Sequence, residues 1–535
     1  MSAGHEFRLP IHSIVDSVTR KFPEKNHIWT QFVTAATTCL VAWACFATGY
    51  SDMTAVAGDA VINSTHLPQP GPIADPYAAA ALIQYYVAKN GSDVTGNGSL
   101  VNPWRTINHA IDVLSSHGAR HGGVCINVRP GIYHESVNIG SQYYNGYTHR
   151  NGTLVSGNSD TPRGYFVLRS TVRHGATIAP GAAYDYSDGF SFTNASYIVV
   201  DGFNIVGNDH APNLNATGIN FAGSSATVNH SSHIIIMNNI VHGWGLAGIA
   251  SEHTDYINVE GNVVYGNSNT SKWGGSGIGV NWEPVALNSG VWHTGSPALA
   301  KFHNIVRNNA SFHNAEVNIQ GQPHWDGNGI ILDGFNANQG ANPAYRQPTL
   351  VENNVTAYNG GAGIITGGSG ASYVTIRNNT SFNNQLDPAN RATIRGEIAI
   401  EGNFGDSSHN DIVVNNIAVA NPKLSPHDSA YVDAGVSRTN PNTNNTWACN
   451  LSFNGTTGQA SIAFVNTTST FATAHGNIPG RNPLFANTAR NNFTLRNGSP
   501  AIGSGTAAYG VPAVDFLGRL RSGSKDMGAY SQRGH

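Results

Sequence analysis

Three oxygen-bearing side chains stand close together in the phrase HWDGNGIILD: Asp326, Asn328 and Asp333. Carboxylate and amide oxygens are ligands that calcium accepts in a flexible geometry. If neighbouring Gly-Ile segments stack as adjacent strands, alternation predicts an outward column of polar residues, namely Glu252, Asn281, Glu283, Asp333, Glu397 and Glu401. Like charges about 4.8 Å apart repel unless a cation or a basic group neutralises them. We therefore expect Asp326, Asn328 and Asp333 to bind a metal ion, with Ca²⁺ as the candidate cofactor. The alternative is a solvated face whose carboxylates never converge, and no EF-hand or RTX spacing is present.

Basic side chains precede this phrase. Lys301, His303 and Arg307 follow one another in ALAKFHNIVRNN, and His324 stands beside Asp326. Removing the proton alpha to the carboxylate of a uronic acid needs a base and a stabilised anionic intermediate. We expect Lys301 or His303 to be the base, Arg307 to bind a substrate carboxylate, and His324 to be a further catalytic candidate. The alternatives are a surface lysine at the start of a strand and a histidine that only holds a turn.

Four of the nine tryptophans lie in insertions rather than in repeated strands: Trp273, Trp282, Trp292 and Trp325. Aromatic rings on loops are what a sugar-stacking surface needs. These four residues and Glu283 are the predicted substrate-binding set. Packing of the insertions onto the body of the protein is the alternative for each tryptophan.

Paired carboxylates also permit glycoside hydrolysis, with Asp326 and Asp333, or Asp333 and Glu283, as acid and base. Neither an adjacent Asp-Asp pair nor Gly-His-Gly, which are typical of polygalacturonases, occurs in the sequence. A third hypothesis is a non-catalytic solenoid that binds carbohydrate or adheres to a cell surface.

An asparagine-centred phrase predicts the elements that position these residues. Its asparagines are Asn204, Asn239, Asn262, Asn309, Asn354, Asn379 and Asn416, spaced by 35, 23, 47, 45, 25 and 37 residues. These spacings indicate a coil of about 23 residues that is lengthened by loops or doubled. Alternating apolar strands flank each asparagine, and most phrases are followed by a Gly-Ile strand. Three short strands per coil predict an all-β parallel β-helix, whose asparagines occupy turns and form hydrogen-bonded ladders.

Composition agrees with this fold class. The chain of 535 residues has 61 glycines, 40% hydrophobic residues and only 11% charged residues, which describes a protein rich in turns and strands rather than a helical or disordered one. A formal net charge of -3 and the lack of a basic run interleaved with aromatics argue against nucleic acid as a partner.

The chain divides into three parts. Residues 1–57 combine a basic stretch, an apolar run from about Phe32 to Thr48 and the small residues Ala55 and Ala57, which predicts a secretory signal peptide or, alternatively, a membrane anchor. Residues 58–83 form a linker, and residues 84–530 form the β-helix domain, with site-forming insertions at about 268–347. We expect a monomer that is secreted, periplasmic or displayed at the cell surface, without further membrane contact.

An amphipathic helix is expected at the start of the solenoid, from about Pro103 to Ser115. Its apolar residues stand at helical spacing: Trp104, Ile107, Ala110, Ile111 and Leu114. A helix laid over the open end of a β-solenoid buries its apolar cross-section, so we interpret it as a cap.

The two ends of this region resemble a known group of proteins. YYVAKNGSD, NPWRTINHAID and INVRPGIYHESV at one end, and NPLFANTARNNFTLRNGSPAIGSGT and DFLGRLRSGSKDMGAY at the other, are similar to the terminal signatures of secreted right-handed parallel β-helix proteins of the pectate-lyase-like superfamily. DGNGIILD resembles the Asp-Gly-Asn-Gly-Ile-Ile-x-Asp motif of a lyase-like subset. The resemblance implies a right-handed β-helix and a polysaccharide substrate. It favours a lyase that cleaves a uronic-acid-containing polymer by β-elimination, although fold alone does not settle function.

Overall fold

The structure is a computed structural model. It describes residues 67–71, 73, 82–116, 123–140, 143–144, 147–148, 161, 163–181, 187–208, 215–223, 231–281, 299–316, 324–336, 344–368, 370–390, 395–426, 428–521 and 525–532. All of them belong to the compact unit Ile62–His535. The predicted signal or anchor lies outside the described residues, as do Trp282, Glu283 and Trp292. Within the described ranges, no helix has the length and apolar character needed to cross a membrane.

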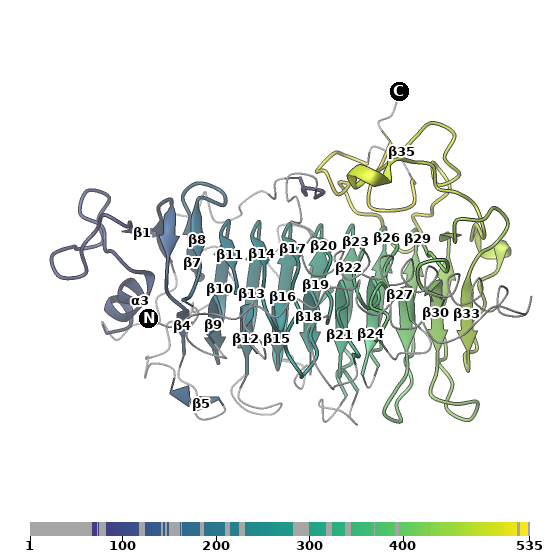
Figure 1. Ribbon diagram of the computed structural model, residues 1–535, viewed down its shortest axis with the longest axis horizontal. Helices are drawn as coiled ribbons and strands as arrows, with labels where there is room; N and C mark the ends of the chain where they lie inside the picture. The colour runs from purple at the N-terminus through teal and green to yellow at the C-terminus, as the bar shows by residue number, and fades with distance from the viewer. Residues whose placement is uncertain are drawn as a thin grey trace, which may run out of the picture. The chain divides into compact units, whose positions relative to one another are not determined.

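Three parallel sheets make up this unit, and each coil of the chain gives one strand to each sheet in turn (Figure 1). In the order of pairing, sheet A contains β1 (Ile83–Val87), β2 (Val124–Val128), β7 (Phe166–Ser170), β10 (Ser196–Asp201), β13 (Ser231–Met237), β16 (Thr254–Glu260), β19 (Asn304–Arg307), β22 (Thr349–Glu352), β25 (Val374–Arg377), β28 (Ile412–Val414) and β31 (Thr446–Ala448). Sheet B contains β3 (Gly131–Tyr133), β8 (Ala176–Ile178), β11 (Asn204–Val206), β14 (Ile240–His242), β17 (Val263–Tyr265), β20 (Ala310–Phe312), β23 (Val355–Ala357), β26 (Thr380–Phe382), β29 (Ile417–Val419) and β32 (Leu451–Phe453).

Sheet C contains β4 (Val137–Ile139), β9 (Phe190–Thr193), β12 (Thr217–Ala222), β15 (Ala247–Glu252), β18 (Ile278–Asn281), β21 (Ile330–Asp333), β24 (Ile364–Gly367), β27 (Arg395–Glu401), β30 (Asp428–Ala434) and β33 (Ile462–Val465). Smaller elements are the hairpins β5–β6 (Tyr143–Tyr144, Tyr147–Thr148) and β34–β35 (Phe485–Asn487, Asn492–Leu495), and the 3-10 turns η2 (Thr473–His475) and η3 (Thr488–Arg490). The structure confirms the right-handed parallel β-helix that the repeats and the resemblance predicted.

Register places the same kind of residue at the same point of successive coils. In sheet C, Ile278 pairs with Ile330, which pairs with Ile364, and all three are fully buried in the interior. Ile331 and Asp333 alternate with this inward set and face outward, as the sequence predicts. Stacked aliphatic side chains therefore form one continuous core along the coils.

Asparagine ladders hold the corners between sheets. At the corner from sheet A to sheet B, the backbone N–H of each ladder asparagine donates to the side-chain oxygen of the next, at 2.8–3.0 Å, through Asn239, Asn262, Asn309, Asn354, Asn379, Asn416, Asn450 and Asn477. The left-handed backbone region is taken by the preceding residue, for example Asn308 with a φ of 55°. The ladder residues are buried, so each side chain satisfies donors that would otherwise be unpaired.

A second ladder runs along the corner from sheet B to sheet C through Asn267, Asn314, Asn359 and Asn384. It ends on a carboxylate, because the N–H of Asn384 donates to Glu397 Oε1 at 2.8 Å. Glu397 is therefore fully buried, whereas alternation had placed it on the outer face. Glu397 lies in the corner just before the regular part of β27, and the equivalent residue one coil earlier is Gly363. Strand alternation does not apply in this corner.

The predicted capping helix is present as α3 (Ile107–Ser116), with Ile107, Ala110, Ile111 and Leu114 buried against the core. It begins later than expected, because Pro103 and Trp104 belong to the loop before it. Asp93 accepts hydrogen bonds from the Arg105 and Thr106 N–H groups, and Glu135 accepts those of Ile107 and Asn108. These carboxylates satisfy the free donors of the first turn.

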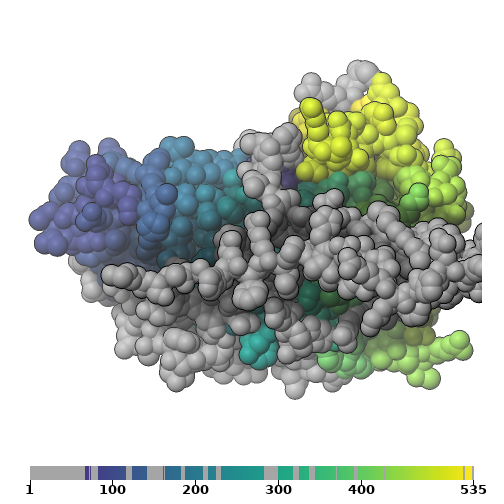
Figure 2. Space-filling view, in the orientation of Figure 1, coloured from purple at the N-terminus to yellow at the C-terminus, as the bar shows by residue number. Residues whose placement is uncertain are grey.

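The C-terminal segment covers the outer face of the later strands of sheet B. Phe485, Phe493, Phe516 and Tyr530 pack with outward side chains of sheet B such as Phe312 in one apolar cluster. In Figures 1 and 2 this segment, in yellow, stands beside the C-terminal half of the coils.

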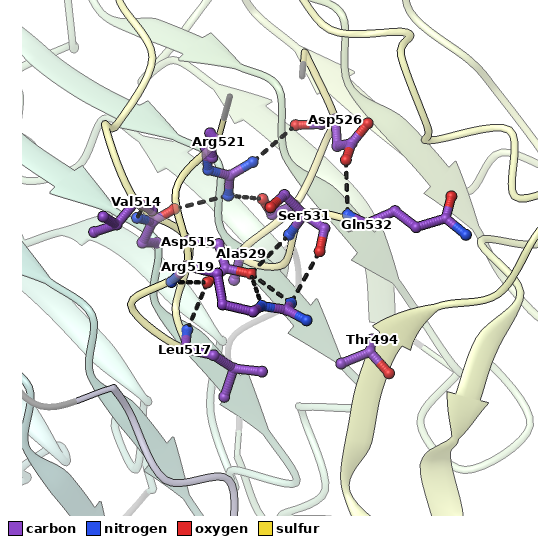
Figure 3. Close-up of polar contacts among 12 residues, drawn as sticks. Thr494, Val514, Asp515, Leu517, Arg519, Arg521, Asp526, Ala529, Ser531 and Gln532 are labelled. Carbon is purple, nitrogen blue, oxygen red and sulfur yellow. Dashed lines mark hydrogen bonds and ion pairs between the residues drawn. The ribbon is translucent and has the colours of Figure 1, made fainter. Parts of the chain in front are cut away.

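Charged residues fold the C-terminal segment onto itself (Figure 3). Asp515 accepts hydrogen bonds from Arg519 Nε at 2.8 Å and from the Ser531 N–H at 3.1 Å, while Arg521 donates to the Gly528 carbonyl and reaches Asn353 on the coils. These contacts give a structural role to DFLGRLRSGSKDMGAY. The C-terminal segment therefore occupies the outer face of these later strands of sheet B.

Candidate active site

The corner from sheet B to sheet C brings two carboxyl groups together. Glu316 follows Ala315 in the corner after β20, and Asp326 stands in the turn that enters β21 of the same coil. Glu316 Oε2 accepts hydrogen bonds from the backbone N–H groups of Trp325 at 2.7 Å and Asp326 at 3.0 Å. Glu316 Oε1 and Asp326 Oδ2 both lie against Gly274. The two side chains therefore converge at one point although an insertion separates them in the sequence.

Burial sets the protonation of this pair. Glu316 is only 1% exposed, and loss of hydration followed by the negative charge of Asp326 raises its pKa to about 8, against the lowering effect of the two N–H donors. The carboxyl of Glu316 therefore holds its proton at neutral pH. A proton donor next to a second carboxylate is the arrangement that general acid–base catalysis requires.

Glycines allow this close approach. A β-carbon at Gly274, whose φ is +82°, would collide with Asp326 Oδ2 and lie 3.1 Å from Glu316 Oε1. Gly327 has a φ of +75°, and a β-carbon there would lie 2.9 Å from the Ala315 α-carbon. Only glycine combines these backbone conformations with such short separations at little cost.

Two exposed indoles adjoin the carboxyl pair. Trp273 precedes Gly274 and is 67% exposed, and Trp325 precedes Asp326 and is 52% exposed. Ser271 anchors the first of these loops by donating its hydroxyl to Asn215 Oδ1 and accepting the Trp273 N–H. Large exposed aromatic side chains beside polar groups are suited to stacking on sugar rings. The structure thus brings two of the four predicted tryptophans to the site.

His324 belongs to the same cluster through Asp387. Its Nδ1 lies 2.6 Å from Asp387 Oδ2, and both side chains are buried. Asp387 follows Asn384 and belongs to the second coil after the one that contains His324. From the same segment, Asn390 Nδ2 donates a hydrogen bond to the Asp326 carbonyl at 3.1 Å. The buried carboxylate of Asp387 fixes the orientation of the imidazole, and the catalytic role of His324 stays a prediction.

The three predicted metal ligands do not surround one point. Asn328 Nδ2 donates to Asp326 Oδ1 at 3.1 Å, and Asn328 Oδ1 accepts the Ala362 N–H at 2.8 Å. Asp333 stands at the opposite end of β21, roughly 16 Å further along an extended chain, where it pairs with Asn281. Within the described ranges no group of three His, Cys, Asp or Glu side chains is arranged to hold a metal. As one set, these residues do not fit a calcium ion, and calcium binding stays a prediction.

The other predicted basic residues lie on sheet A, away from this corner. His303 Nδ1 lies 3.0 Å from the buried Asp255, and its ring stacks on Tyr256 at 4.1 Å. Lys301 is exposed with its Nζ over Phe302. These residues precede β19, so their closeness to Asp326 in sequence does not put them on the same side of the coil.

Arg307 is engaged within sheet A. Its guanidinium lies 2.6 Å from Glu260 and 3.8 Å from Glu352, and Glu352 also binds Arg377 at 2.7 Å. Register stacks these four residues at the same point of successive strands. Alternating charges thus stabilise the coils where like charges would repel.

Glu316 and Asp387 are site residues that the sequence analysis missed. Each follows a ladder asparagine, Asn314 or Asn384, by only two or three residues. A carboxylate two or three residues after a ladder asparagine lies close to the turn that enters sheet C. This spacing is the sequence signal that could have identified both residues.

Comparisons with known proteins give similar structures but no family. No family model matches the chain, and no curated protein matches it. Solved structures that resemble it include a rhamnogalacturonan lyase (14% identity, covering 69% of this chain and 87% of that one, TM-score 0.38), an alginate lyase from Paenibacillus sp. (14%, 67% and 96%, TM-score 0.38) and the A-module of a mannuronan C-5 epimerase from Azotobacter vinelandii (13%, 71% and 96%, TM-score 0.36). At these values no activity is transferred, and the fold rests on the strand pairing described above.

Proposed function

We propose that this protein is a polysaccharide-active enzyme that hydrolyses a glycosidic bond with Glu316 as general acid and Asp326 as its carboxylate partner. The observation that carries the proposal is the convergence of a protonated, buried Glu316 and Asp326 at Gly274, beside two exposed indoles. Paired carboxyl groups with different protonation are the chemical requirement of most glycoside hydrolases.

In this mechanism the sugar stacks on Trp273 or Trp325. Glu316 gives its proton to the glycosidic oxygen as the bond to the anomeric carbon breaks. Water forms the new bond to that carbon while the carboxylate of Asp326 accepts one of its protons, and transfer of this proton to Glu316 restores both groups. Glu316 is suited to the first step because its two backbone N–H donors fix its orientation.

A second candidate is the β-elimination expected from the sequence. The observation that favours it is the His324–Asp387 pair at 2.6 Å, which orients an imidazole that could remove a proton next to a uronate carboxylate. Neutral Glu316 would then donate a hydrogen bond to that carboxylate. The carboxylates of Asp326 and Asp387 repel a polyuronate, so hydrolysis is the stronger candidate.

We also propose that the enzyme acts outside the cytoplasm, with residues 1–57 as the export signal, and that it is a monomer. Support comes from the basic and apolar pattern of that segment. The capping helix and the bonds from Cys449 to the His475 carbonyl and from Ser452 to the Ile478 carbonyl cover sheet edges at both ends of the coils.

The test uses the purified full-length protein with a panel of neutral, amino and uronic acid polysaccharides. New reducing ends report either reaction, whereas absorbance near 235 nm reports only the unsaturated product of elimination. Glu316→Gln and Asp326→Asn should each abolish product, and Asp112→Asn, on helix α3, is the matched control. Reducing ends without absorbance support hydrolysis. A rise in absorbance that is lost in His324→Ala supports elimination, and chelator then tests the predicted calcium.

A further inference from the structure

We propose that the chain segment before the first strand is a clasp that holds the C-terminal segment against the coils. We call its described part, residues 67–71 and 73, the N-terminal strap. It belongs to the predicted linker of residues 58–83 and to the same compact unit as the coils. Leu67, Pro70 and Gly71 are buried, so the strap is packed as part of the fold. The clasp goes beyond the proposed function and does not depend on it.

Gly71 joins the two ends of the chain, backbone to backbone. Its N–H donates to the Phe516 carbonyl at 2.8 Å. A β-carbon at Gly71 would lie 2.4 Å from the carbonyl carbon of Leu517 and 2.5 Å from the Gly518 nitrogen. The approach is so close that a residue with a side chain does not fit without moving one of the two backbones.

The turn that receives Gly71 is held by its own hydrogen bonds (Figure 3). The Gly518 N–H donates to the Asp515 carbonyl at 2.9 Å, and the Leu517 N–H donates to Asp515 Oδ1 at 3.0 Å. Asp515 is fully buried and also accepts a hydrogen bond from Arg519 Nε. This turn therefore cannot move away from an added side chain without leaving buried polar groups unpaired.

The strap contacts the outer faces of two sheets on either side of Gly71. Leu67 belongs to the apolar cluster that contains Tyr265 of β17 and Phe516. Ile73 packs against the outward cluster of sheet A that contains Met237. A β-carbon at Gly261, in the corner between these sheets, would lie 2.7 Å from Ile73 Cγ1. The strap thus crosses the corner from sheet B to sheet A and meets the C-terminal segment on the way.

Asparagines of one kind hold both ends of the chain. Each stands one residue before a ladder asparagine and has a φ between 53° and 58°. Asn238 accepts a hydrogen bond from the Ile73 N–H at 3.4 Å. Asn353, Asn378 and Asn415 donate to backbone carbonyls of the C-terminal segment at 2.7–3.1 Å. In the repeated Asn-Asn pairs, the second residue therefore builds the ladder and the first holds a chain end.

The clasp makes the final packing of the protein depend on both ends of the chain. The strap follows the predicted export signal and is made early, whereas Phe516 and Leu517 are made much later. Gly71 cannot dock until they are present. Until the two meet, each segment lacks the contacts of the other, and the C-terminal segment opens more readily to proteases.

The test compares Gly71→Ala with Gly181→Ala in the full-length protein. Gly181 is the matched control because it is exposed and a β-carbon there would meet no atom within 4 Å. Trypsin cleavage at Arg519, Arg521 and Lys525 under native conditions should be about tenfold faster in Gly71→Ala, since cleavage follows the population of the open segment. Gly181→Ala should match the parent. Equal rates in the two variants would overturn the clasp.

A second variant removes a strap contact without a collision. Leu67→Ala deletes a side chain that is 4% exposed, and Leu100→Ala, at 55% exposure, is its control. Leu67→Ala should also speed this cleavage while circular dichroism shows folded coils. If Gly71→Ala does not fold, this pair decides the matter, and equal rates in the pair would overturn the clasp.

Hydrogen exchange tests the reverse direction. Asp515→Asn weakens the turn that receives Gly71, so exchange of the Gly71 amide should rise about tenfold while amides of β13 stay protected. Unchanged exchange at Gly71 would show that the strap docks without the C-terminal segment and would overturn the proposal.

Discussion

One carboxyl oxygen of Glu316 accepts a hydrogen bond from the backbone N–H of Asp326, and the other lies next to the side chain of Asp326, where both side chains contact Gly274. The backbone contacts hold the two groups at a fixed separation, and the side-chain contact couples their charges. This relationship ties an acid that keeps its proton to a carboxylate in one rigid corner of the β-helix. It is the reason that the proposed active site lies here rather than along the outward column of sheet C.

Gly274→Ala should lower catalytic activity to a much greater extent than it lowers the stability of the fold. The new methyl group collides with Asp326 Oδ2 and crowds Glu316 Oε1, and misplacement of reacting groups by about 1 Å costs on the order of 100-fold in rate. Gly455→Ala is the matched control, because Gly455 has a nearly equal φ of +85° with open space around it. Kinetics and thermal melting of both variants check this. Equal loss of activity in the two variants would contradict the assignment.

Arg307→Gln should destabilise the coils without changing KM. It removes the cationic partner of buried Glu260 and one of the two cationic partners of Glu352. Breaking such a pair costs about 3–5 kcal/mol when fully buried, and we expect about 2–3 kcal/mol because the Arg307 side chain is 22% exposed. Urea unfolding and substrate kinetics measure the two effects, with exposed Arg438→Gln as the control. A raised KM at unchanged stability would restore the role of Arg307 in binding a substrate carboxylate.

Asn309→Ala should be among the most destabilising single changes. The side chain of Asn309 accepts from the Asn262 N–H and donates to the Val259 carbonyl and to Asn354 Oδ1. Its loss leaves several buried groups unpaired, at about 1–3 kcal/mol for each. Exposed Asn90→Ala should cost less than about 0.5 kcal/mol. A similar shift of the unfolding midpoint in both variants would show that the ladder does not stabilise the fold.

A buried acid pair makes stability fall as pH rises. Burial is the largest cause that raises the pKa of Glu397, to about 7, and of Asp428, well above its ordinary value, and their mutual repulsion adds to the shift of Asp428. Because the folded pKa exceeds the unfolded value of 4.5 for Glu397, its stabilisation is fully present below pH 4.5 and is lost as pH rises through about 7.

Asp428→Asn should therefore flatten this dependence, because the amide stays neutral and its oxygen can still accept the Asn421 N–H. Above pH 7 the variant should be more stable than the parent by roughly 1 kcal/mol or more. Unfolding midpoints measured below and above that pH decide the matter. A variant with the parent's pH slope would show that another group is responsible.

Most of the fold could be predicted from the sequence, because each coil repeats the same short-range physics. The ladder asparagines and the Gly-Ile strands occur where the corners and sheet C require them, and Ile330, Leu332, Ile331 and Asp333 face the sides that alternation gives. Alternation failed at Glu397, which sits in a corner where the chain does not alternate.

The site was harder to predict because it is made across coils. Glu316 and Asp326 flank an insertion within one coil, whereas Asp387 comes from the second coil after it, and only Asp326 lay in a phrase that attracted attention. Lys301 and His303 were grouped with Asp326 because they are near it in sequence, although the coil carries them to sheet A. The local sequence pattern does not predict where the chain rejoins the coil after an insertion. The pairing of His303 with Asp255 could therefore not be predicted.

The pH dependence of kcat/KM on a cleaved polysaccharide, for the parent protein and Glu316→Gln, tests the central claim most directly. The account predicts a basic limb with an apparent pKa of about 8, because activity requires protonated Glu316 and is lost as pH rises through that value. It also predicts that Glu316→Gln is folded and inactive at every pH. A variant that retains activity, or a parent profile with no basic limb near this value, would contradict it.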